Sequence, residues 1–291
     1  AAVVARGMGT CCVAGCGELS IREEIKTLSC GSLTLTEGDI ISVDGSSGCI
    51  YSGEISTVLV ENNQDLQRLL SWADEVARLK VRANAETVKD LETAMKFGAQ
   101  GVGLARTEHM FFGQDRILEM RRLILADNEE EIKIALKLLL HFQEEDFYQM
   151  FQAVQDKPMI IRLLDPPMHE FLPKDPQEIK LLAEKLHKSP EKLARQIENL
   201  QENNPMLGHR GCRLGITQPE IYKMQAEAIF RSAIRLHQEG LKIKPEIMIP
   251  LIADKKELDF VKSYLTEHIQ WLFQDYEQDP FPYEIGTMIE L

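Results

Sequence analysis

Three arginines in this chain each follow an apolar run typical of a β-strand. They are Arg106 in GVGLARTEHMFF, Arg162 in MIIRLLDPPMHEF and Arg210 in NPMLGHRGCRLG. A guanidinium presents several N–H donors in a fixed fork, which suits carboxylate and phosphate oxygens. The strand ends of a parallel barrel meet on one face, where binding sites form. Three arginines converging there predict a site for a small anion that carries these groups.

A fourth run of the same kind, YEIGTMIEL, delivers Glu290. A carboxylate among arginines suggests a divalent cation, and Mg²⁺ takes one or two carboxylates together with water and substrate oxygens. The alternative is that each charged residue forms an ordinary structural ion pair. We do not expect this of all three arginines at once, because clustered cations repel one another without an anion between them.

Further polar residues lie close to these runs. Direct substrate contact or acid–base chemistry is one interpretation, and shaping or orienting the loops is the favoured one. The residues are Asn84, Glu108, His109, Asp165, His169 and His209. The segment Arg6–Gly9 (RGMG) resembles a phosphate-holding glycine turn, although so short a pattern often occurs by chance.

From Leu79 onward the chain alternates strand-like and helix-like segments. Six strand candidates occur, and a helix follows each of the first five. They are the segments 79–85, 101–106, 159–165, 209–216, 245–252 and 283–291. Repeated βα units predict a parallel sheet with covered faces, and six in sequence favour a barrel. A complete barrel has eight strands, so we predict an α/β fold, an incomplete (β/α)8 TIM barrel with about six of its eight strands.

The segments before the barrel differ in pattern. Residues 1–57 contain short alternating runs separated by glycine turns, which predicts part of a small β-rich domain. Residues 58–78 carry apolar residues at helical spacing and predict a linker helix. Residues 79–291 would then form the barrel, truncated at its C-terminus. The sequence opens and closes in the middle of regular elements, so we interpret it as an internal fragment.

Composition narrows the class of protein. The chain has 291 residues, 44% of them hydrophobic, and a formal net charge of -13. This charge argues against binding nucleic acid or an anionic membrane surface. No apolar run approaches the ~20 residues that span a bilayer. The six cysteines form no CxxC pair, which favours buried thiols in a reducing compartment over a metal or redox cluster. We predict a cytoplasmic protein and leave an organelle open.

Taken together, several of these segments resemble the PEP-utilising enzymes. AAVVARGMGTCC is similar to the stretch that follows the catalytic histidine in the swivelling phosphohistidine domain of that family. GAQGVGLARTEHMFF, RLLDPPMHEFLP, NPMLGHRGCRLG, PEIMIP and GTMIE resemble its PEP/pyruvate-binding barrel, in order. Within the family, RTEHMFF, DPPMHEF and NPMLGHRGCR look like the pyruvate, phosphate dikinases. The PEP synthases and enzyme I of the sugar phosphotransferase system carry different residues there.

The resemblance implies roles for the four residues identified first. Arg106, Arg162 and Arg210 would bind the phosphate and carboxylate of phosphoenolpyruvate (PEP), and Glu290 would hold Mg²⁺ and contact substrate. The family's phosphorylated histidine would lie immediately before Ala1, so no catalytic residue is expected within the chain. The second carboxylate for Mg²⁺, the proton-donating cysteine and the ATP-grasp domain of the family have no counterpart here. Cys212 is no substitute for that cysteine, because it follows Arg210.

The resemblance implies an enzyme of the dikinase type. It would interconvert ATP, phosphate and pyruvate with AMP, pyrophosphate and PEP through a phosphohistidine. This segment would bind PEP, pyruvate and Mg²⁺, while ATP and phosphate would act through the missing N-terminal domain. The isolated fragment is expected to be inactive. Two alternatives stay open, a truncated non-catalytic binding module and an enzyme I-like PEP–protein phosphotransferase. A homodimer is also left open.

Overall fold

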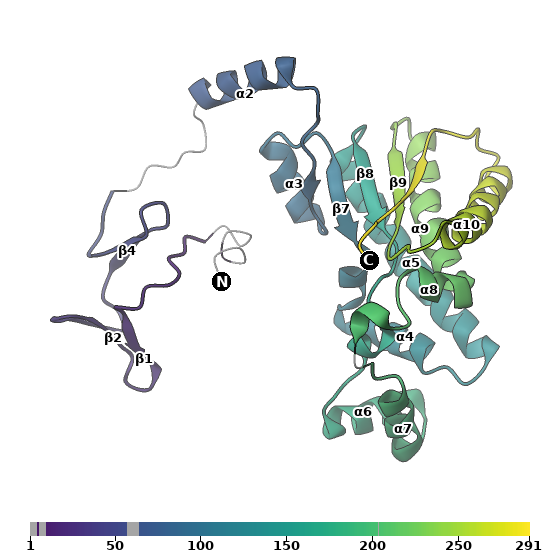
Figure 1. Ribbon diagram of the computed structural model, residues 1–291, viewed down its shortest axis with the longest axis horizontal. Coiled ribbons are helices and arrows are strands. Elements are labelled where there is room, and N and C mark those ends of the chain that lie inside the picture. The colour runs from purple at the N-terminus through teal and green to yellow at the C-terminus, as the bar shows by residue number, and fades with distance from the viewer. Residues whose placement is uncertain (1–4, 6–9, 57–63, 203) are drawn as a thin grey trace. The chain divides into compact units, whose positions relative to one another are not determined.

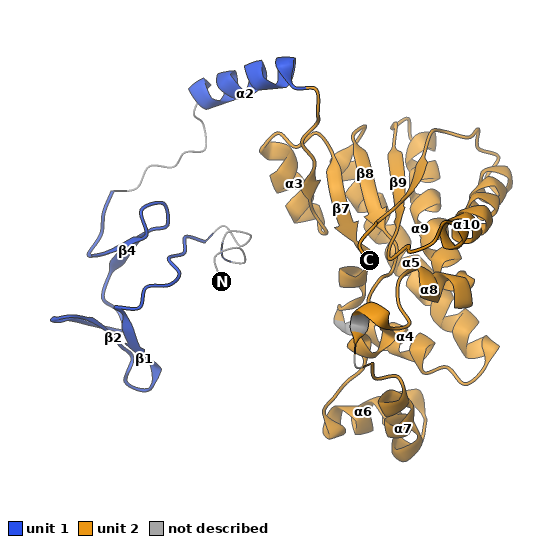
Figure 2. Ribbon diagram, viewed as in Figure 1, with its two compact units in different colours: residues 1–77 blue, residues 78–291 orange. Residues whose placement is uncertain are grey.

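The computed structural model describes residues 5, 10–56, 64–202 and 204–291. These residues form two compact units, residues 1–77 and 78–291 (Figure 2). The second unit contains all the site residues named above that follow Arg6–Gly9. The RGMG turn and the residues beside the expected phosphohistidine lie outside the described residues.

The first unit is built from short antiparallel strands. Strands β1 (Ser20–Arg22), β2 (Thr27–Cys30) and β3 (Leu33–Thr36) form one sheet, with the short 3-10 helix η1 (Glu23–Ile25) between the first two. Strands β4 (Ile41–Asp44) and β5 (Cys49–Ser52) form a hairpin. Side chains in all five strands are half-buried or exposed. The helix α2 (Gln64–Val76) completes the unit.

The second unit contains one parallel sheet of five strands, in the order β10–β9–β8–β7–β6 (Figure 1). The strands are β6 (Ala83–Asn84), β7 (Val102–Arg106), β8 (Pro158–Arg162), β9 (Lys244–Ile249) and β10 (Glu284–Thr287). Each hydrogen-bonded pair runs in parallel. Parallel neighbours bring their carboxyl ends to the same edge of the sheet, where β7 and β8 end in Arg106 and Arg162.

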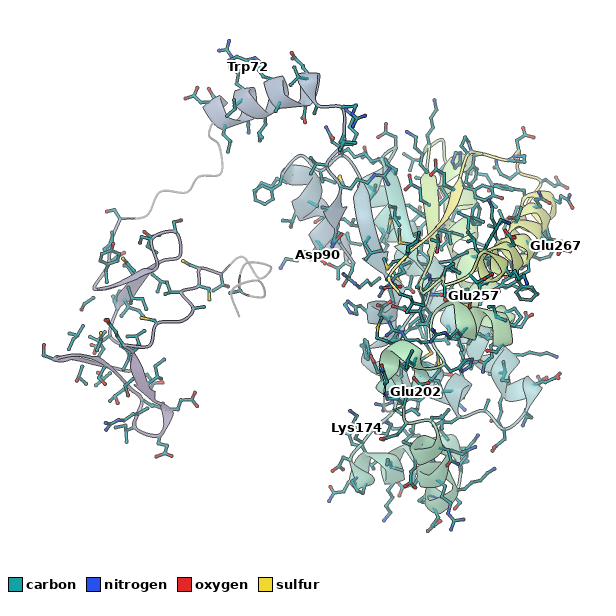
Figure 3. All side chains as sticks on the ribbon, in the orientation of Figure 1. Trp72, Asp90, Lys174, Glu202, Glu257 and Glu267 are labelled. Atoms are coloured by element: carbon teal, nitrogen blue, oxygen red, sulfur yellow. The ribbon has the colours of Figure 1, made fainter. Side chains whose placement is uncertain are left out.

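Helices connect the strands and pack together beside the sheet. They are α3 (Val88–Lys96), α4 (Gln114–Ile124), α5 (Glu129–Val154), α6 (Pro176–Leu186), α7 (Pro190–Asn199), α8 (Cys212–Thr217), α9 (Pro219–Gln238) and α10 (Lys255–Asp275). Three 3-10 helices, η2 (Thr107–Phe111), η3 (Met168–Phe171) and η4 (Pro205–Leu207), lie in the connections. Several helices begin at a residue whose side chain accepts a backbone N–H of the first turn, which satisfies a donor that the helix itself cannot pair. At α10, Asp254 and Glu257 form a capping box, and Glu257 is labelled in Figure 3.

The two faces of the sheet differ in burial. On β8, Met159 and Ile161 are fully buried and join the main core with α5 and α9, while Ile160 and Arg162 alternate with them on a half-buried face. That second face also carries an ion pair across the sheet. The Arg82 guanidinium lies 2.5 Å from a carboxylate oxygen of Glu246 on β9, although β7 and β8 separate their strands.

The predicted parallel α/β fold is confirmed, but the predicted strand count is wrong for the residues that the structure describes. Five strands form the sheet where six were expected, and β8 pairs directly with β9. The segment 209–216 is a loop followed by α8. Gly211 has a positive φ of 55°, which interrupts an extended chain, and the residues after it close a helical turn. Closure into a barrel is not seen in the part of the chain that the structure describes.

Candidate anion-binding site

The carboxyl edge of the sheet places Arg106 and Arg162 next to each other. The two residues are register partners on β7 and β8. Neighbouring strands lie ~4.8 Å apart, so both side chains can reach one small ligand. This part of the predicted convergence follows directly from the strand register.

A single carboxylate connects Arg162 to Arg210. Asp165 Oδ2 lies 3.1 Å from Arg162 Nη1 and 2.7 Å from Arg210 Nη2. Asp165 is buried, and its backbone carbonyl also accepts hydrogen bonds from the Arg210 side chain at 3.2 Å and from the Gly211 N–H at 3.0 Å. Arg210 therefore reaches the site from a loop rather than from a strand end. Asp165 holds both guanidiniums in one cluster.

Electrostatics keep Arg210 charged in this setting. Burial by itself disfavours the charged guanidinium, but the hydrogen bond and charge of Asp165, with the charges of Glu290 and Glu170, outweigh it and raise the pKa of Arg210. Opposite charges nearby favour the ionised form. The contribution of Glu290 also shows that this carboxylate lies within electrostatic range of Arg210.

Glu108 is the second carboxylate on Arg162. One of its oxygens, Oε1, pairs with Arg162 Nη2. Its other oxygen, Arg162 Nε and His169 Nδ1 are buried and have no hydrogen-bond partner among the described residues. Buried polar groups are normally paired, and an unpaired one calls for an explanation such as an unseen water or ion. The Glu108 and Arg162 atoms leave polar capacity at the site for a ligand or for solvent.

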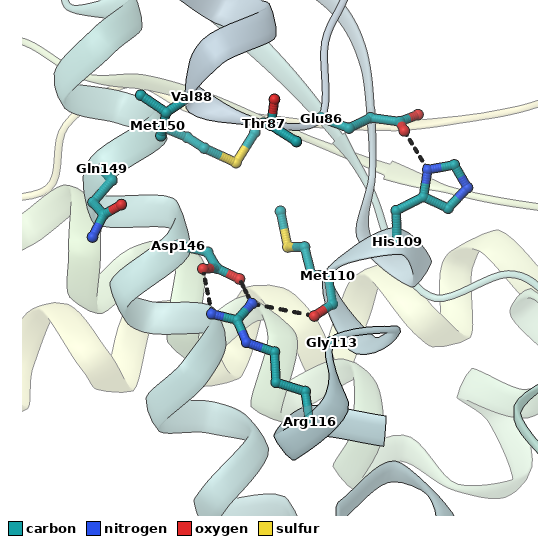
Figure 4. Close-up of a pocket in the computed structure, with 10 residues that line it drawn as sticks. All are labelled: Glu86, Thr87, Val88, His109, Met110, Gly113, Arg116, Asp146, Gln149 and Met150. Atoms are coloured by element: carbon teal, nitrogen blue, oxygen red, sulfur yellow. Dashed lines mark hydrogen bonds and ion pairs between the residues drawn. The ribbon is translucent and has the colours of Figure 1, made fainter. Parts of the chain in front are cut away.

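Arg106 is held by a different residue, Glu86. The Glu86 carboxylate accepts a hydrogen bond from Arg106 Nη1 at 2.8 Å and pairs through its other oxygen with His109 Nδ1. Glu86 and His109 also line a pocket of about 310 Å³ beside the N-terminus of α3 (Figure 4). Arg116 and Asp146 form another ion pair in the wall of this pocket.

Glu290 is fixed by the backbone of another loop. Its Oε1 accepts the Leu251 N–H at 2.9 Å. Thr287, the last residue of β10, donates its hydroxyl to the Ile249 carbonyl. Leu251 has a positive φ of 62°, an unusual conformation for a bulky residue. The loop after β9 therefore has a strained backbone conformation at Leu251, and the N–H of this residue points at Glu290.

Helix α9 supports the segment that carries Asp165. The Tyr222 hydroxyl donates to the Leu164 carbonyl at 2.8 Å, and Gln225 Oε1 accepts the Leu164 N–H at 2.8 Å. Gln225 Nε2 in turn donates to Thr107 Oγ1 at 2.9 Å. All these groups are buried, and burial raises the pKa of Tyr222 well above its usual value, so it stays a neutral donor. The helix thus fixes the residues next to both Arg106 and Asp165.

We did not expect all three arginines to pair with carboxylates at once, and this expectation is wrong. Glu86 pairs with Arg106, Glu108 pairs with Arg162, and Asp165 pairs with both Arg162 and Arg210. Glu290 instead binds a backbone N–H. These contacts place the four predicted residues without testing their roles, which stay predictions.

Two other candidate residues, His209 and Asn84, take no part in the ion pairs described above. His209 Nε2 lies 2.6 Å from Thr217 Oγ1 on α8, and Asn84 ends β6.

The prediction that the cysteines are buried is confirmed for Cys212 alone. Cys11, Cys16 and Cys49 are exposed, Cys12 and Cys30 are half-buried, and all six are free. Burial raises the pKa of Cys212 to about 11. Within the described part of the chain, no group of three or more His, Cys, Asp or Glu residues could hold a metal.

Sequence reasoning missed Glu86, Leu251, Tyr222 and Gln225. Glu86 follows the first strand two residues after Asn84, so its position beside a strand end was a usable signal. Gln225 is a polar residue on a mostly apolar helix face, which is also a recognisable pattern. The residue type gave no indication of the positive φ at position 251, because leucine rarely adopts a positive φ.

Family models match nearly the whole chain. The model described as the PEP-binding domain of PEP-utilising enzymes matches residues 60–291, and the model of their mobile domain matches residues 1–48. The chain belongs to the PEP-utilising enzyme family. The resemblance inferred from the sequence is therefore confirmed. The carboxyl edge of the sheet, which carries Arg106 and Arg162, lies within the range matched by the PEP-binding domain.

The curated relatives of this chain include several pyruvate, phosphate dikinases. The chain is 49% identical to pyruvate, phosphate dikinase of Clostridium symbiosum and 48% identical to that of Rickettsia prowazekii, with 100% of this chain and 33% of each relative covered. It is 45% identical to pyruvate, phosphate dikinase 1, chloroplastic, of Arabidopsis thaliana, with 30% of that relative covered. The chain thus spans about a third of the length of the curated relatives it matches. Among the described residues, no helix is long and apolar enough to cross a membrane.

Proposed function

We propose that residues 78–291 form the PEP- and pyruvate-binding part of a pyruvate, phosphate dikinase, with Arg106, Arg162 and Arg210 as the groups that bind the ligand. The observation that carries the proposal is the clustering of these guanidiniums at one edge of the sheet, two of them joined by Asp165. The names of these relatives favour a dikinase over an enzyme I-like phosphotransferase.

The geometry suits phosphoryl transfer. In the direction of PEP synthesis, the enolate oxygen of pyruvate would attack the phosphorus of the phosphohistidine. An O–P bond forms as the N–P bond breaks. Negative charge lies on the equatorial oxygens, and fixed guanidiniums are suited to stabilise it. Because Asp165, Glu108 and Glu86 hold the three arginines in place, little reorganisation is needed when the ligand arrives.

The charge balance of the cluster supports a divalent cation. Glu86, Glu108 and Asp165 pair with the three guanidiniums and balance their charge, and the negative charges of Glu290 and Glu170 also act on Arg210. The arginines alone therefore do not make the site positive. Mg²⁺ accepts a hard oxygen from one or two carboxylates, and the second oxygen of Glu290, which has no hydrogen bond among the described residues, fits this role. The cation would neutralise ligand charge.

In the proposed function, the full-length enzyme converts ATP, phosphate and pyruvate to AMP, pyrophosphate and PEP through a phosphohistidine. The relatives are about three times as long as this chain, so ATP and phosphate would act on other parts of such a protein. The polypeptide of residues 1–291 is expected to bind PEP without completing the reaction. The five strands would belong to a TIM barrel, and we keep the cytoplasm as the expected compartment and a homodimer as an open question.

The test is replacement of Arg162 by Ala in the full-length protein. Losing the most buried of the three guanidiniums leaves Asp165 and Glu108 without their shared partner and removes ligand contacts. PEP–pyruvate exchange is expected to fall by at least about 100-fold. Phosphorylation of the protein by ATP and phosphate should continue, since it does not use this site.

A matched control is Arg116→Ala, which removes a guanidinium from the nearby pocket wall. Its exchange rate should stay within about threefold of the parent, because its partner Asp146 lies outside the arginine cluster. Unchanged exchange in the Arg162 variant, or equal losses in both variants, would contradict the proposed function.

A further inference from the structure

Arg106 differs from the other two arginines in how it is held. Its side chain is 36% exposed, against 11% for Arg162 and 15% for Arg210. Arg162 and Arg210 share the buried Asp165, whereas the carboxylate partner of Arg106 is Glu86. Because the Arg106 side chain is long and only half-buried, its position depends on its anchor, the Glu86 carboxylate.

Glu86 is well placed to serve as this anchor. It directly precedes Thr87, the N-cap of α3, where a capping box with Asp90 fixes the backbone. Its own side chain is only 19% exposed. His109 pairs with the second carboxylate oxygen (Figure 4). With Arg106 on the first oxygen, both oxygens have partners and the carboxylate plane is fixed.

The Arg106 guanidinium keeps donors for a ligand while it stays bound to Glu86. A guanidinium has five N–H donors, and Glu86 takes one from Nη1. Arg106 does not have to leave its carboxylate in order to bind an anion. Glu86 can therefore act during the reaction, and not only in the protein without ligand.

We propose that Glu86, with His109 behind it, is a positioning residue that fixes Arg106 for transfer of the phosphoryl group. This inference rests on the proposed function. Glu86 does not touch the reacting atoms, and its effect passes through the Arg106 guanidinium. Loss of its charge frees Arg106 to bind the ligand in several geometries, of which few stabilise the transition state.

The test is Glu86→Gln in the full-length protein, assayed by PEP–pyruvate exchange. Glutamine keeps the size and one acceptor oxygen but removes the charge. The kcat of exchange is expected to fall on the order of 10- to 100-fold, while the KM for PEP changes by less than about threefold. The KM is preserved because the freed guanidinium still attracts the anion.

A double-mutant cycle separates positioning from a general structural role. In an Arg106→Ala background, Glu86→Gln should cause no further loss of kcat, because the residue through which it acts is already absent. An equal loss in both backgrounds would overturn the inference, as would an Arg106→Ala variant with normal exchange. Glu86→Asp keeps the charge and should recover part of the rate; it also serves if the glutamine variant does not fold.

Asp146→Asn is the matched control. It removes the charge from another Arg–carboxylate pair in the wall of the same pocket, and Arg116 also binds the Met110 carbonyl. Its kcat should equal that of the parent, and a loss like that of Glu86→Gln would refute the specific role of Glu86. If Arg162→Ala abolishes exchange while Glu86→Gln does not change it, the inference fails and the proposed function stands. If neither variant changes exchange, both fail.

Discussion

At the scale of single residues, the loop before α8 is set by a close contact that only glycine permits. Gly211 has a φ of 55°, and a Cβ there would lie 2.7 Å from Leu251 Cβ and 3.2 Å from Asp165 Oδ1. Leu251 donates its N–H to Glu290, and Arg210 directly precedes the glycine. The absence of a side chain at Gly211 therefore lets the loop that carries Arg210 pack against the buried Asp165 and against Leu251, which binds Glu290.

Replacing Gly211 by Ala should test this contact. The added methyl group meets both the unfavourable φ and the Leu251 side chain, so we expect the free energy of unfolding to fall by about 2–4 kcal/mol. Urea denaturation followed by circular dichroism would measure it. Gly240→Ala is the control, because Gly240 also has a positive φ but open space around it. It should cost about 1–2 kcal/mol, and equal losses would show that the contact is unimportant.

At the scale of elements, α9 acts as the support for the site. Tyr222 and Gln225 lie one turn apart and bind both backbone groups of Leu164, next to Asp165. Gln225 also reaches Thr107, next to Arg106. One helix thus ties together the ends of β7 and β8, which a sheet alone would leave to the loops.

Gln225→Ala removes the shared link between these two strand ends. The buried Leu164 N–H and Thr107 hydroxyl would lose their partner, and each unsatisfied group costs about 1–3 kcal/mol. We expect the free energy of unfolding to fall by roughly 2–5 kcal/mol in chemical denaturation. Gln149→Ala is a suitable comparison, because Gln149 binds the exposed Glu145. If the two variants lost the same stability, α9 would not have this supporting role.

At the scale of the whole molecule, charge opposes the binding of an anion. The chain carries a formal net charge of -13, and the carboxylates around the three arginines at least balance the charge of the guanidiniums. Under the proposed function, long-range attraction would not draw PEP to the site. Binding would come from short-range hydrogen bonds and from the proposed cation, which would arrive with or before the ligand.

Removal of divalent cations should weaken PEP binding strongly. With EDTA present, the Kd of PEP for the full-length protein is expected to rise by at least about tenfold in titration calorimetry, and added Mg²⁺ should restore it. Glu290→Gln should make the affinity for PEP nearly insensitive to EDTA. Equally tight binding with and without EDTA in the parent protein would contradict the metal proposal.

Much of the fold could be predicted because βα repeats have a strong local pattern. Apolar runs and amphipathic helices identified the strands that end in Arg106, Arg162 and the segment before Glu290. The segment around Arg210 was misjudged because a short apolar run with glycines suits a strand, a loop or a helical turn equally well. In the folded chain Gly211 packs against Leu251, and no local sequence pattern reports such a contact.

The sequence by itself determined the family, the parallel α/β class and the residues that could bind an anion, because these depend on residue type and spacing along the chain. The tertiary structure decided which carboxylate holds which arginine. Glu86, Glu108 and Asp165 lie 20, 54 and 45 residues from the arginines they pair with at Arg106, Arg162 and Arg210. Such pairings follow from strand register and loop packing, and they are absent from any local stretch of sequence.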